Sequence, residues 1–435
     1  MIVYDIRMSL NAPYRAGEDA SPERIAIIGA GIVGCATAWA LAREGRKVLL
    51  IDRSPPALAG ASFGNAGHIA TEQLQPLPSP TLLWRFWREL FLFGGPLHLP
   101  AHRWLPLAPW MLRFAQAAFR QSRNTPALAA LVRPAAEFLE RYLREIGHQE
   151  LLCRGGHYSV WLGPRSVAQA ARALRNAQTL GVRAAPAPEG LLRTLAARAG
   201  AASATGCHFP DSAHVIDPRR LANALAEAAV GAGARFARTE VRELFPRGDR
   251  IGIRIEDRVL TVGAAVVCAG VESAPLLARF GVRAPLTAER GYHLEMPGAP
   301  PLASAPVVYA DHSVIVTPMD GRLRATSDLE FERHGAPPDP RKLERLRTRL
   351  RGLGYPCPSG PGWVGSRPTL PDYLPAIGRA PGAAELFYAT GHQHLGLTLA
   401  APTAAVIAAL VAHREPPIEA GAFDLRRFAR ARHPG

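Results

Sequence analysis

The fold of this chain is decided by the stretch RIAIIGAGIVGCATAWALAREGRKVLLIDR, residues 24–53. Two short apolar runs, residues 25–28 and 48–51, have the composition of strands that are buried on both faces of a parallel sheet. Between them, the pattern G-x-G-x-x-G at residues 29–34 opens a segment with helical periodicity, and Asp52 follows the second run. A strand, a glycine turn, a helix, a strand and an acid in this register predict a dinucleotide-binding unit.

The glycines and the acid have separate roles in such a unit. Glycine permits a tight turn and a close approach to a pyrophosphate, whose negative charge lies on the amides of the helix N-terminus. The carboxylate of Asp52 can accept hydrogen bonds from a ribose diol. The alternative is a turn that packs the helix against the strand without a ligand. We expect cofactor contacts at Gly29, Gly31, Ile32, Val33, Gly34, Asp52 and Arg53.

The next stretch, AGASFGNAGHIA at residues 59–70, is rich in small residues, with Ser62, Asn65 and His68 among them. A simple nicotinamide enzyme usually continues here with another helix and strand, whereas this composition is typical of a loop that wraps an extended ligand. The pattern therefore favours FAD over NAD. An ordinary surface loop stays open as the alternative, because small polar residues also mark such loops.

The length of 435 residues is too great for one compact core and indicates two domains. Asp217-Pro218 begins a helix, and the apolar run 262–268 has the pattern of a strand that returns to the first sheet. Residues 314–325 alternate like antiparallel strands around an Asp320-Gly321 hairpin turn. We therefore expect a cofactor domain that is interrupted by insertions, which build a substrate domain with a mixed sheet.

Composition and charge rank the partners. The net charge is +15, and nearly all of it comes from arginine, because Lys47 and Lys342 are the only lysines. The arginines are spread along the chain without a dense run, so we expect a solvated basic surface and no nucleic-acid partner. The five cysteines are isolated, with neither a disulfide framework nor a metal-ligand spacing, which indicates a reducing compartment.

Several segments bear on a membrane contact. Residues 1–23 carry charges and no apolar core, so we interpret them as an N-terminal extension rather than a secretory signal. Residues 76–150 are helical and aromatic-rich, which fits helices packed on the second domain, a lid, or an interfacial membrane helix. The uncharged stretches 25–42 and 395–412 are long enough to span a bilayer, but their glycine and alanine content argues against it.

Two C-terminal stretches supply candidate site residues. Arg367 lies in a proline-rich turn, where a guanidinium can grip a carboxylate with two hydrogen bonds; a surface arginine is the alternative. His392 and His394 could be a metal pair, but they need further ligands and no second cluster has ligand-like spacing, so we expect no metal. The amides of residues 391–397 lead into a helix that begins near Thr398, and a helix N-terminus favours negative charge.

Taken together, these segments resemble the D-amino-acid oxidase superfamily of FAD-dependent amine oxidoreductases, and most of all its bacterial D-amino-acid dehydrogenase group. The resemblance covers nearly the whole chain from residue 24, with the motifs in the family's order. The motifs that carry it are GAGIVG (29–34), SFGNAGHI (62–69), VVCAG (266–270), ERGYHLE (289–295), WVGSRPTLPD (363–372) and GHQHLGLTLA (391–400).

The resemblance implies an α/β fold, in which a Rossmann-like FAD-binding domain is assembled from discontinuous segments. It also implies an α+β substrate domain with a mixed or antiparallel sheet and helices. The implied boundaries place residues 24–75, 206–285 and 366–435 in the FAD-binding domain and residues 76–205 and 286–365 in the substrate-binding domain.

The resemblance also implies roles for single residues. By position, Arg367 would bind the substrate carboxylate, Tyr292 would face the pocket and hydrogen-bond the same group, and His394 would contact the substrate. Residues 61–68 would wrap FAD between the pyrophosphate and the flavin, and Val241 would meet the adenine through its backbone. The implied cofactor residues beyond the first unit are Ala61, Ser62, Asn65, Ala66, Gly67, His68, Val241, Ala269, Gly270, Gly391, His392, Gln393, Leu395, Gly396, Leu397 and Thr398.

Two departures from the family's pattern bear on substrate or acceptor preference. Gln393 stands where dehydrogenases often have a second glycine, and Thr326-Ser327 replaces a Gly-Thr pair. In addition, no cysteine lies between Cys268 and Cys357, the region where sarcosine-oxidase relatives attach flavin covalently. We therefore expect non-covalent FAD.

The implied reaction is oxidative deamination of a D-amino acid: the Cα hydride passes to flavin N5, and the imine is hydrolysed to a keto acid. The electrons would pass to a quinone or another acceptor. One alternative is oxidation of a cyclic or secondary amine, such as D-proline, D-hydroxyproline, sarcosine or glycine; an NAD-dependent dehydrogenase and an RNA-linked flavoprotein are further ones. We expect a cytoplasmic enzyme of amino-acid catabolism. A peripheral contact with the inner face of the cytoplasmic membrane, through residues 82–118, stays open.

Overall fold

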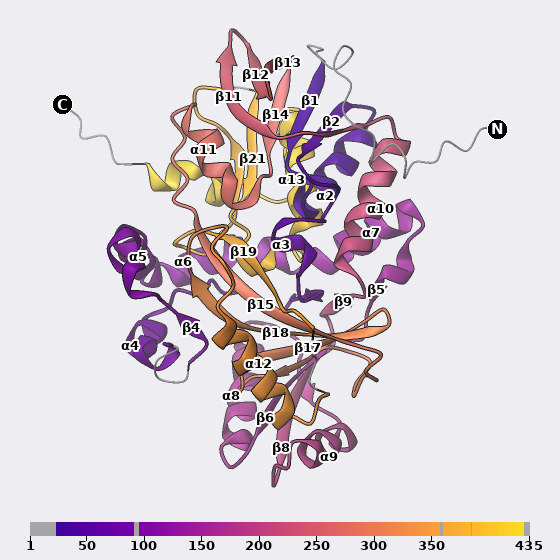
Figure 1. The fold of residues 1–435 in the computed structure, drawn as a ribbon, viewed down its shortest axis with the longest axis vertical. Helices are drawn as coiled ribbons and strands as arrows, with labels where there is room; N and C mark the ends of the chain where they lie inside the picture. Colours follow the sequence, from indigo (N-terminus) through magenta and orange to yellow (C-terminus); the bar gives the residue numbers. More distant parts are fainter. Residues whose placement is uncertain (1–22, 91–94, 357–359, 384, 430–435) are drawn as a thin grey trace.

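The computed structural model describes residues 23–90, 95–356, 360–383 and 385–429 (Figure 1). The predicted N-terminal extension and Cys357 lie outside the described residues. In Figure 1, one sheet and its helices fill the upper part of the molecule and a larger, strongly twisted sheet fills the lower part.

The upper part holds the predicted dinucleotide-binding sheet. Its strand order is β10-β2-β1-β14-β21-β20, and only β20 runs antiparallel to its neighbour among these described strands. The strands are β1 (Arg24–Ile28), β2 (Lys47–Asp52), β10 (Arg235–Arg238), β14 (Ala264–Val267), β20 (Ala376–Arg379) and β21 (Leu386–Thr390).

Burial on both faces explains the apolar runs in the sequence. Ile25 and Ile27 pack into the core beneath α2 (Ile32–Ala42), α10 (Pro218–Gly231) and α13 (Ala400–Val411). Ala26 and Ile28 alternate with them and face the opposite core. That second core is covered by α11 (Ser273–Ala278) and by the antiparallel strands β11 (Val241–Arg247), β12 (Arg250–Ile255) and β13 (Arg258–Val262).

The lower part is a mixed sheet with the path β19-β15-β18-β17-β16-β6-β8-β7 in the described residues, and β4 pairs with β18 beside this path. The Asp320-Gly321 turn joins β17 to β18, as predicted. The strands are β4 (Leu97–His98), β6 (His157–Leu162), β7 (Ala185–Pro186), β8 (Ala204–Phe209), β15 (Thr287–Pro297), β16 (Val307–Tyr309), β17 (Val314–Met319), β18 (Arg322–Phe331) and β19 (Trp363–Thr369).

Short elements and helices complete the two parts. Strands β3 (His68–Ile69), β9 (Ala213–Val215) and β5 (Leu152–Cys153) form a small sheet between them. The helix α10 begins where the Asp217-Pro218 pair predicts, and Asp217 caps it by accepting from the Arg219 amide. The other helices are α3 (Gly60–Phe63), α4 (Pro80–Glu89), α5 (Trp104–Ala118), α6 (Gln121–Val132), α7 (Ala135–Ile146), α8 (Ser166–Thr179), α9 (Glu189–Arg198) and α12 (Pro340–Gly352).

Two observations bear on the predicted boundaries and spans. Strands β8 and β19 cross the predicted limits at residues 206 and 366, and both pair in the larger sheet, so the division of the chain stays a proposal.

Among the described helices, none has the length and apolar character that a bilayer crossing needs. The stretch 395–412 is folded instead as a short turn and the 12-residue helix α13.

Candidate active site

One cavity joins the two parts of the molecule. It has a volume of about 1280 Å³ and begins where β1, β2 and β14 end, at Gly29, Asp52 and Cys268. It ends against the larger sheet, at residues of β18 and β19 that include Thr326 and Arg367. Ordinary small-molecule pockets measure about 300–1000 Å³, so this cavity has room for a dinucleotide together with a small substrate.

The glycine turn leaves no room for side chains. Gly29 has a φ of +107°, and a Cβ there would lie 2.6 Å from the Cys268 carbonyl oxygen. A Cβ on Gly34 would lie 1.8 Å from the Gly29 carbonyl oxygen, so helix α2 can start this close to β1 only without one. Gly31 borders the cavity, where a Cβ would meet only the Ser62 hydroxyl at 3.2 Å.

The acid at the end of β2 is held in place by amides. Asp52 accepts hydrogen bonds from the backbone N–H groups of Ala30 at 2.7 Å and Ser54 at 2.8 Å. Burial raises the pKa of Asp52, and these two amides oppose the increase. The side chain of Arg53 is paired with Glu272 at 2.7 Å. Asp52 is therefore held in a fixed position where it lines the cavity.

The loop after β2 is ordered by contacts with the helix start. The Ser62 hydroxyl accepts from the Ile32 amide at 3.0 Å, which satisfies one N–H at the beginning of α2. The Asn65 side chain accepts from the Gly67 amide at 2.8 Å. Of the predicted residues in this loop, Ala61, Ser62, Asn65, Ala66 and His68 line the cavity.

Three predicted cofactor glycines do not line the cavity. Gly34 packs on Gly29, as described above. A Cβ on Gly67 would lie 2.7 Å from the Val215 carbonyl oxygen, and one on Gly391 would lie 2.5 Å from the Leu370 side chain. These glycines therefore allow close packing behind the cavity. The other predicted cofactor residues that line it are Ile32, Val33, Arg53, Val241, Ala269, Gly270, His392, Gln393, Leu395, Gly396, Leu397 and Thr398.

Arg367 lies at the far end of the cavity and is held by a buried carboxylate. Its guanidinium is 3.3 Å from Glu289, which is 1% exposed and also accepts hydrogen bonds from Tyr373 at 2.7 Å and Thr369 at 3.3 Å. A Cβ on Gly291 would lie 2.1 Å from the guanidinium, so the arginine needs glycine at that position. Since one carboxylate partner does not use all five N–H donors, the arginine can bind a second carboxylate.

Tyr292 does not face the cavity, contrary to the prediction. It lies on β15 with side chains that alternate between the two faces: Glu289 and Gly291 face Arg367, whereas Tyr292 is on the other face. Its buried hydroxyl donates to Glu330 at 2.6 Å and accepts from the Asp339 amide at 3.1 Å. The position therefore stabilises the sheet against α12 and does not reach a substrate in the cavity.

The buried carboxylate beside Tyr292 gives a stability prediction. Glu330 lies 3.4 Å from Arg290 and 3.5 Å from Lys342, both of which are buried. We expect Glu330→Gln to lower the free energy of unfolding by about 3 kcal/mol, because the buried Arg290 loses its anion and Lys342 loses one of its two carboxylate partners, keeping Asp339. Urea unfolding measures this, with Glu344→Gln, which breaks an exposed pair with Arg351, as the control.

The stability that Glu330 contributes decreases at low pH. Burial by itself would raise the pKa of Glu330, but hydrogen bonds from His98 and Tyr292 and the charges of Lys342 and Arg290 hold the pKa at about 2. The carboxylate thus stabilises the protein above its ordinary pKa of about 4.5, and this contribution is lost as the pH falls towards 2. A variant that kept the wild-type stability would show that the carboxylate is dispensable.

The two C-terminal histidines have different partners. His392 is 3.0 Å from the Thr403 hydroxyl, and His394 is 2.6 Å from the Gln73 side-chain oxygen. Burial lowers the pKa of His394 to about 4; the negative charge of Glu289 opposes the decrease, and the positive charge of Arg367 adds to it. Gln393, between them, has a φ of +47°. This left-handed conformation explains why a glycine would suit the position.

Fold and cavity define the class: a dinucleotide-dependent enzyme whose cofactor cavity reaches an arginine able to bind a carboxylate. Within that class, the chain belongs to the family of FAD-dependent oxidoreductases, because the profile of the FAD dependent oxidoreductase family matches residues 24–410. The enzyme is therefore an FAD-dependent oxidoreductase, as the sequence motifs predicted.

Characterised relatives are similar over nearly their whole length. The chain is 30% identical to a D-amino-acid oxidase of Bradyrhizobium diazoefficiens, with 93% of this chain and 98% of that protein covered. It is 30% identical to D-amino acid dehydrogenase 2 of Ralstonia nicotianae, with 93% and 100% covered. Among solved structures, glycine oxidase from Geobacillus kaustophilus matches with a TM-score of 0.70 at 22% identity, over 95% of this chain and 100% of that chain, which shows a shared fold.

The residues in the cavity fit FAD. The Gly31 backbone faces the cavity where a pyrophosphate would approach the start of α2. Along the cavity, the side-chain atoms Gln393 Oε1 and Thr326 Oγ1 are buried without a hydrogen-bond partner in the described residues. Buried polar atoms rarely stay unpaired, so these atoms indicate a polar ligand beside them.

Sequence reasoning missed several residues of the site. Glu289 and Gly291 lie inside the ERGYHLE motif, where a period of two on β15 places them on one face and Tyr292 on the other. This alternation along the strand could have predicted that Glu289 and Gly291 face Arg367 and that Tyr292 does not. Gln73 gave no such signal, because it meets His394 across 321 residues of sequence.

Proposed function

We propose that this protein oxidises a D-amino acid at Cα, with FAD bound non-covalently in the cavity between its two parts. The observation that carries the proposal is Arg367, an arginine at the far end of the cavity that is fixed by the buried Glu289 and has free donor capacity. Similarity to a D-amino-acid oxidase and to D-amino acid dehydrogenases supports the same substrate class.

The protein's own residues orient the substrate. Arg367 binds the α-carboxylate with two parallel hydrogen bonds, and Glu289, Tyr373 and Thr369 keep the guanidinium from turning. His394 is neutral near pH 7, since its pKa is about 4. It therefore does not repel a substrate ammonium group as that group loses its proton. When bound, FAD supplies the group that accepts the substrate hydride.

The C-terminal helix supports the cofactor in this proposal. Gly396, Leu397 and Thr398 line the cavity just before α13 begins at Ala400. The N-terminus of a helix carries a partial positive charge and favours anions. These residues would therefore stabilise negative charge on the reduced cofactor and raise its reduction potential.

An anaerobic substrate panel tests the proposal. The purified flavoprotein is mixed with D-amino acids, D-proline, D-hydroxyproline, glycine and sarcosine, and bleaching of the flavin absorbance is recorded. We expect bleaching by at least one acyclic D-amino acid. Bleaching by the cyclic or secondary amines alone would replace the proposal with amine oxidation of that kind, and protein without flavin absorbance would contradict FAD dependence. Re-oxidation by a quinone analogue or by oxygen then identifies the acceptor.

We propose further that the acceptor is a membrane quinone, reached through a peripheral contact made by α4 and α5. These helices project from one side of the molecule (Figure 1). They and the adjoining residue carry exposed large apolar side chains: Trp84, Trp104, Leu105, Leu112 and Phe119. Leu105 and Leu112 lie two turns apart on α5 and share one face. Arg85 and Arg120 are also exposed and suit anionic lipids.

The membrane contact gives a prediction with a matched control. We expect Leu105→Ser/Leu112→Ser to reduce binding to vesicles with anionic lipids at least tenfold, since about 1.5–3 kcal/mol is lost for each buried leucine. Co-sedimentation with vesicles measures the binding, and reduction of a water-soluble dye by substrate should stay unchanged. Val167→Ser, at an exposed apolar side chain on α8, is the control. Equal binding of all three proteins would contradict the contact.

A further inference from the structure

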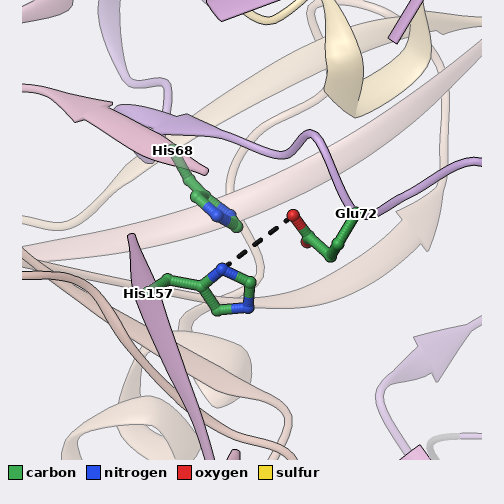
Figure 2. Close-up of side chains that lie close together, drawn as sticks. All are labelled: His68, Glu72 and His157. Carbon is green, nitrogen blue, oxygen red and sulfur yellow. Dashed lines mark ion pairs between the residues drawn. The ribbon is translucent and has the colours of Figure 1, made fainter. Parts of the chain in front are cut away.

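We propose that His68, Glu72 and His157 form a second recognition site in the cavity, which binds a hydrogen-bond donor on the side chain of the substrate. The inference rests on the proposed function and deepens it by naming the substrate class: an amino acid whose side chain ends in a hydroxyl or an ammonium group. Figure 2 shows the three side chains converging, His68 from β3, Glu72 from the segment after it, and His157 from β6. We call them the His–Glu cluster.

The cluster is incompletely bonded, with His157 buried and His68 and Glu72 partly buried. Its ligand atoms lie within 4.8 Å of one another, and all three residues line the cavity. Among the described residues, His68 Nε2 and Glu72 Oε2 are buried side-chain atoms without a hydrogen-bond partner. Glu72 Oε2 is 3.9 Å from His157 Nδ1, which is too long for a hydrogen bond. Unpaired buried polar atoms are costly, so a ligand that bonds both would be favoured.

The hydrogen bonds of His157 determine which kind of ligand fits. Its Nδ1 lies 2.7 Å from the Ser212 hydroxyl, and that hydroxyl donates its only hydrogen to the Phe209 carbonyl oxygen at 3.0 Å. His157 Nδ1 must therefore be the donor to Ser212. The ring also stacks on Phe209 with 4.8 Å between centroids, which fixes its orientation. A metal ion would need a lone pair on this nitrogen, so Nδ1, the ring atom nearest Glu72, is not available as a metal ligand; the lone pair lies on Nε2, which is 3.4 Å from the Ser159 hydroxyl.

Glu72 and His68 are the two groups of the cluster with atoms left to bond a ligand. In the described part of the chain, no arginine or lysine forms an ion pair with Glu72. The titratable group beside it, His157, is neutral because burial holds its pKa well below the ordinary value. Burial raises the pKa of Glu72 to about 7, so the cluster holds a carboxyl group that a bound donor would stabilise in its ionised form. An ammonium group between Glu72 and His68 can donate to both unpaired atoms, whereas a hydroxyl donates its one hydrogen to Glu72 and accepts from His68 Nε2 in the tautomer that carries a proton there.

The cluster lies near the carboxylate-binding end of the cavity. Gln73 follows Glu72 directly and is hydrogen-bonded to His394 at 2.6 Å, and His394 is close enough to Arg367 for its charge to lower the histidine pKa. A substrate bound to Arg367 by its carboxylate can therefore direct its side chain towards the His–Glu cluster.

Isosteric substrates test the inference. D-Norvaline, D-homoserine and D-2,4-diaminobutyrate differ only in a terminal methyl, hydroxyl or ammonium group; D-2-aminobutyrate, D-serine and D-2,3-diaminopropionate are the shorter set. For at least one set, we expect a donor-bearing member to exceed the methyl member tenfold or more in kcat/KM. Glu72→Leu should abolish this preference, so that the members of a set become equal in kcat/KM to within about threefold of one another. Glu72→Gln separates the two donors, because it should lower the ammonium preference more than the hydroxyl preference.

Controls keep the outcomes distinct. Glu150→Leu makes the same substitution at an exposed glutamate outside the cavity and should change nothing. Binding of α-methyl-D-serine and 2-aminoisobutyrate, which have no Cα hydrogen, is measured by calorimetry and needs no turnover. A preference for the hydroxyl analogue that Glu72→Leu removes supports the cluster even if no flavin is bleached, in which case only the proposed oxidation fails. Bleaching without any preference overturns the cluster, and one equivalent of tightly bound zinc would overturn it in favour of a metal site.

Discussion

Replacing Arg367 by leucine is expected to lower kcat/KM by a factor on the order of 10²–10⁴ while the protein keeps its FAD. Charged hydrogen bonds contribute about 1.5–3 kcal/mol each, and a carboxylate held by a bidentate arginine loses two of them. The proposed contacts to the pyrophosphate and the ribose are at the other end of the cavity, which Gly31 and Asp52 line, so we expect flavin binding to be unaffected. Steady-state kinetics and the flavin-to-protein absorbance ratio measure both effects.

Two further variants separate substrate binding from structural damage. Arg367→Leu leaves Glu289 buried without its cation, so the double variant Arg367→Leu/Glu289→Gln should recover stability but not activity. Arg367→Lys keeps the charge and loses the paired geometry, and we expect an intermediate kcat/KM. Unchanged kinetics in Arg367→Leu would remove this residue from the site and, with it, the main support for the proposed orientation of the substrate.

The cofactor half of the site could be predicted from the sequence because its signals are local. The run from residue 24 to residue 53 contains the strand, turn, helix and acid in order, and burial on both faces makes β1 and β2 continuously apolar. The parallel register then brings Gly29, Asp52 and Cys268 to one edge of the sheet. The sequence pattern of residues 24–53 and the positions of these residues in the fold therefore agree.

The substrate half could be predicted only in part. Arg367 was identified by its motif, but the strand that orients it was interpreted with the wrong face towards the cavity, because Tyr292 was placed by family position and not by the alternation along β15. A bulge between Gly291 and Tyr292 also shifts the pairing with β18, which no local pattern reveals. The His–Glu cluster combines His68 with His157, which β3 and β6 bring together from different sheets.

The glycine turn separates a cofactor defect from a folding defect. A Cβ on Gly31 would meet only the Ser62 hydroxyl, at 3.2 Å, so we expect Gly31→Val to fold. It would nevertheless occupy the space of the pyrophosphate, and we expect FAD affinity to fall by a factor on the order of 100 or more, since glycine here serves the close approach of the backbone. Gel filtration followed by the flavin-to-protein absorbance ratio measures the loss.

Gly34→Ala is expected to destabilise the fold itself, whereas Gly31→Val weakens FAD binding. The added Cβ at position 34 would lie 1.8 Å from the Gly29 carbonyl oxygen, and neither backbone can yield without separating α2 from β1. We expect a loss of more than about 4 kcal/mol in the free energy of unfolding, which added FAD does not restore. Gly190→Ala, in α9 with open space around it, is the control and should stabilise by about 0.5–1 kcal/mol. Thermal unfolding with and without FAD distinguishes the three variants. If Gly31→Val kept its flavin, the pyrophosphate would have to lie elsewhere in the cavity.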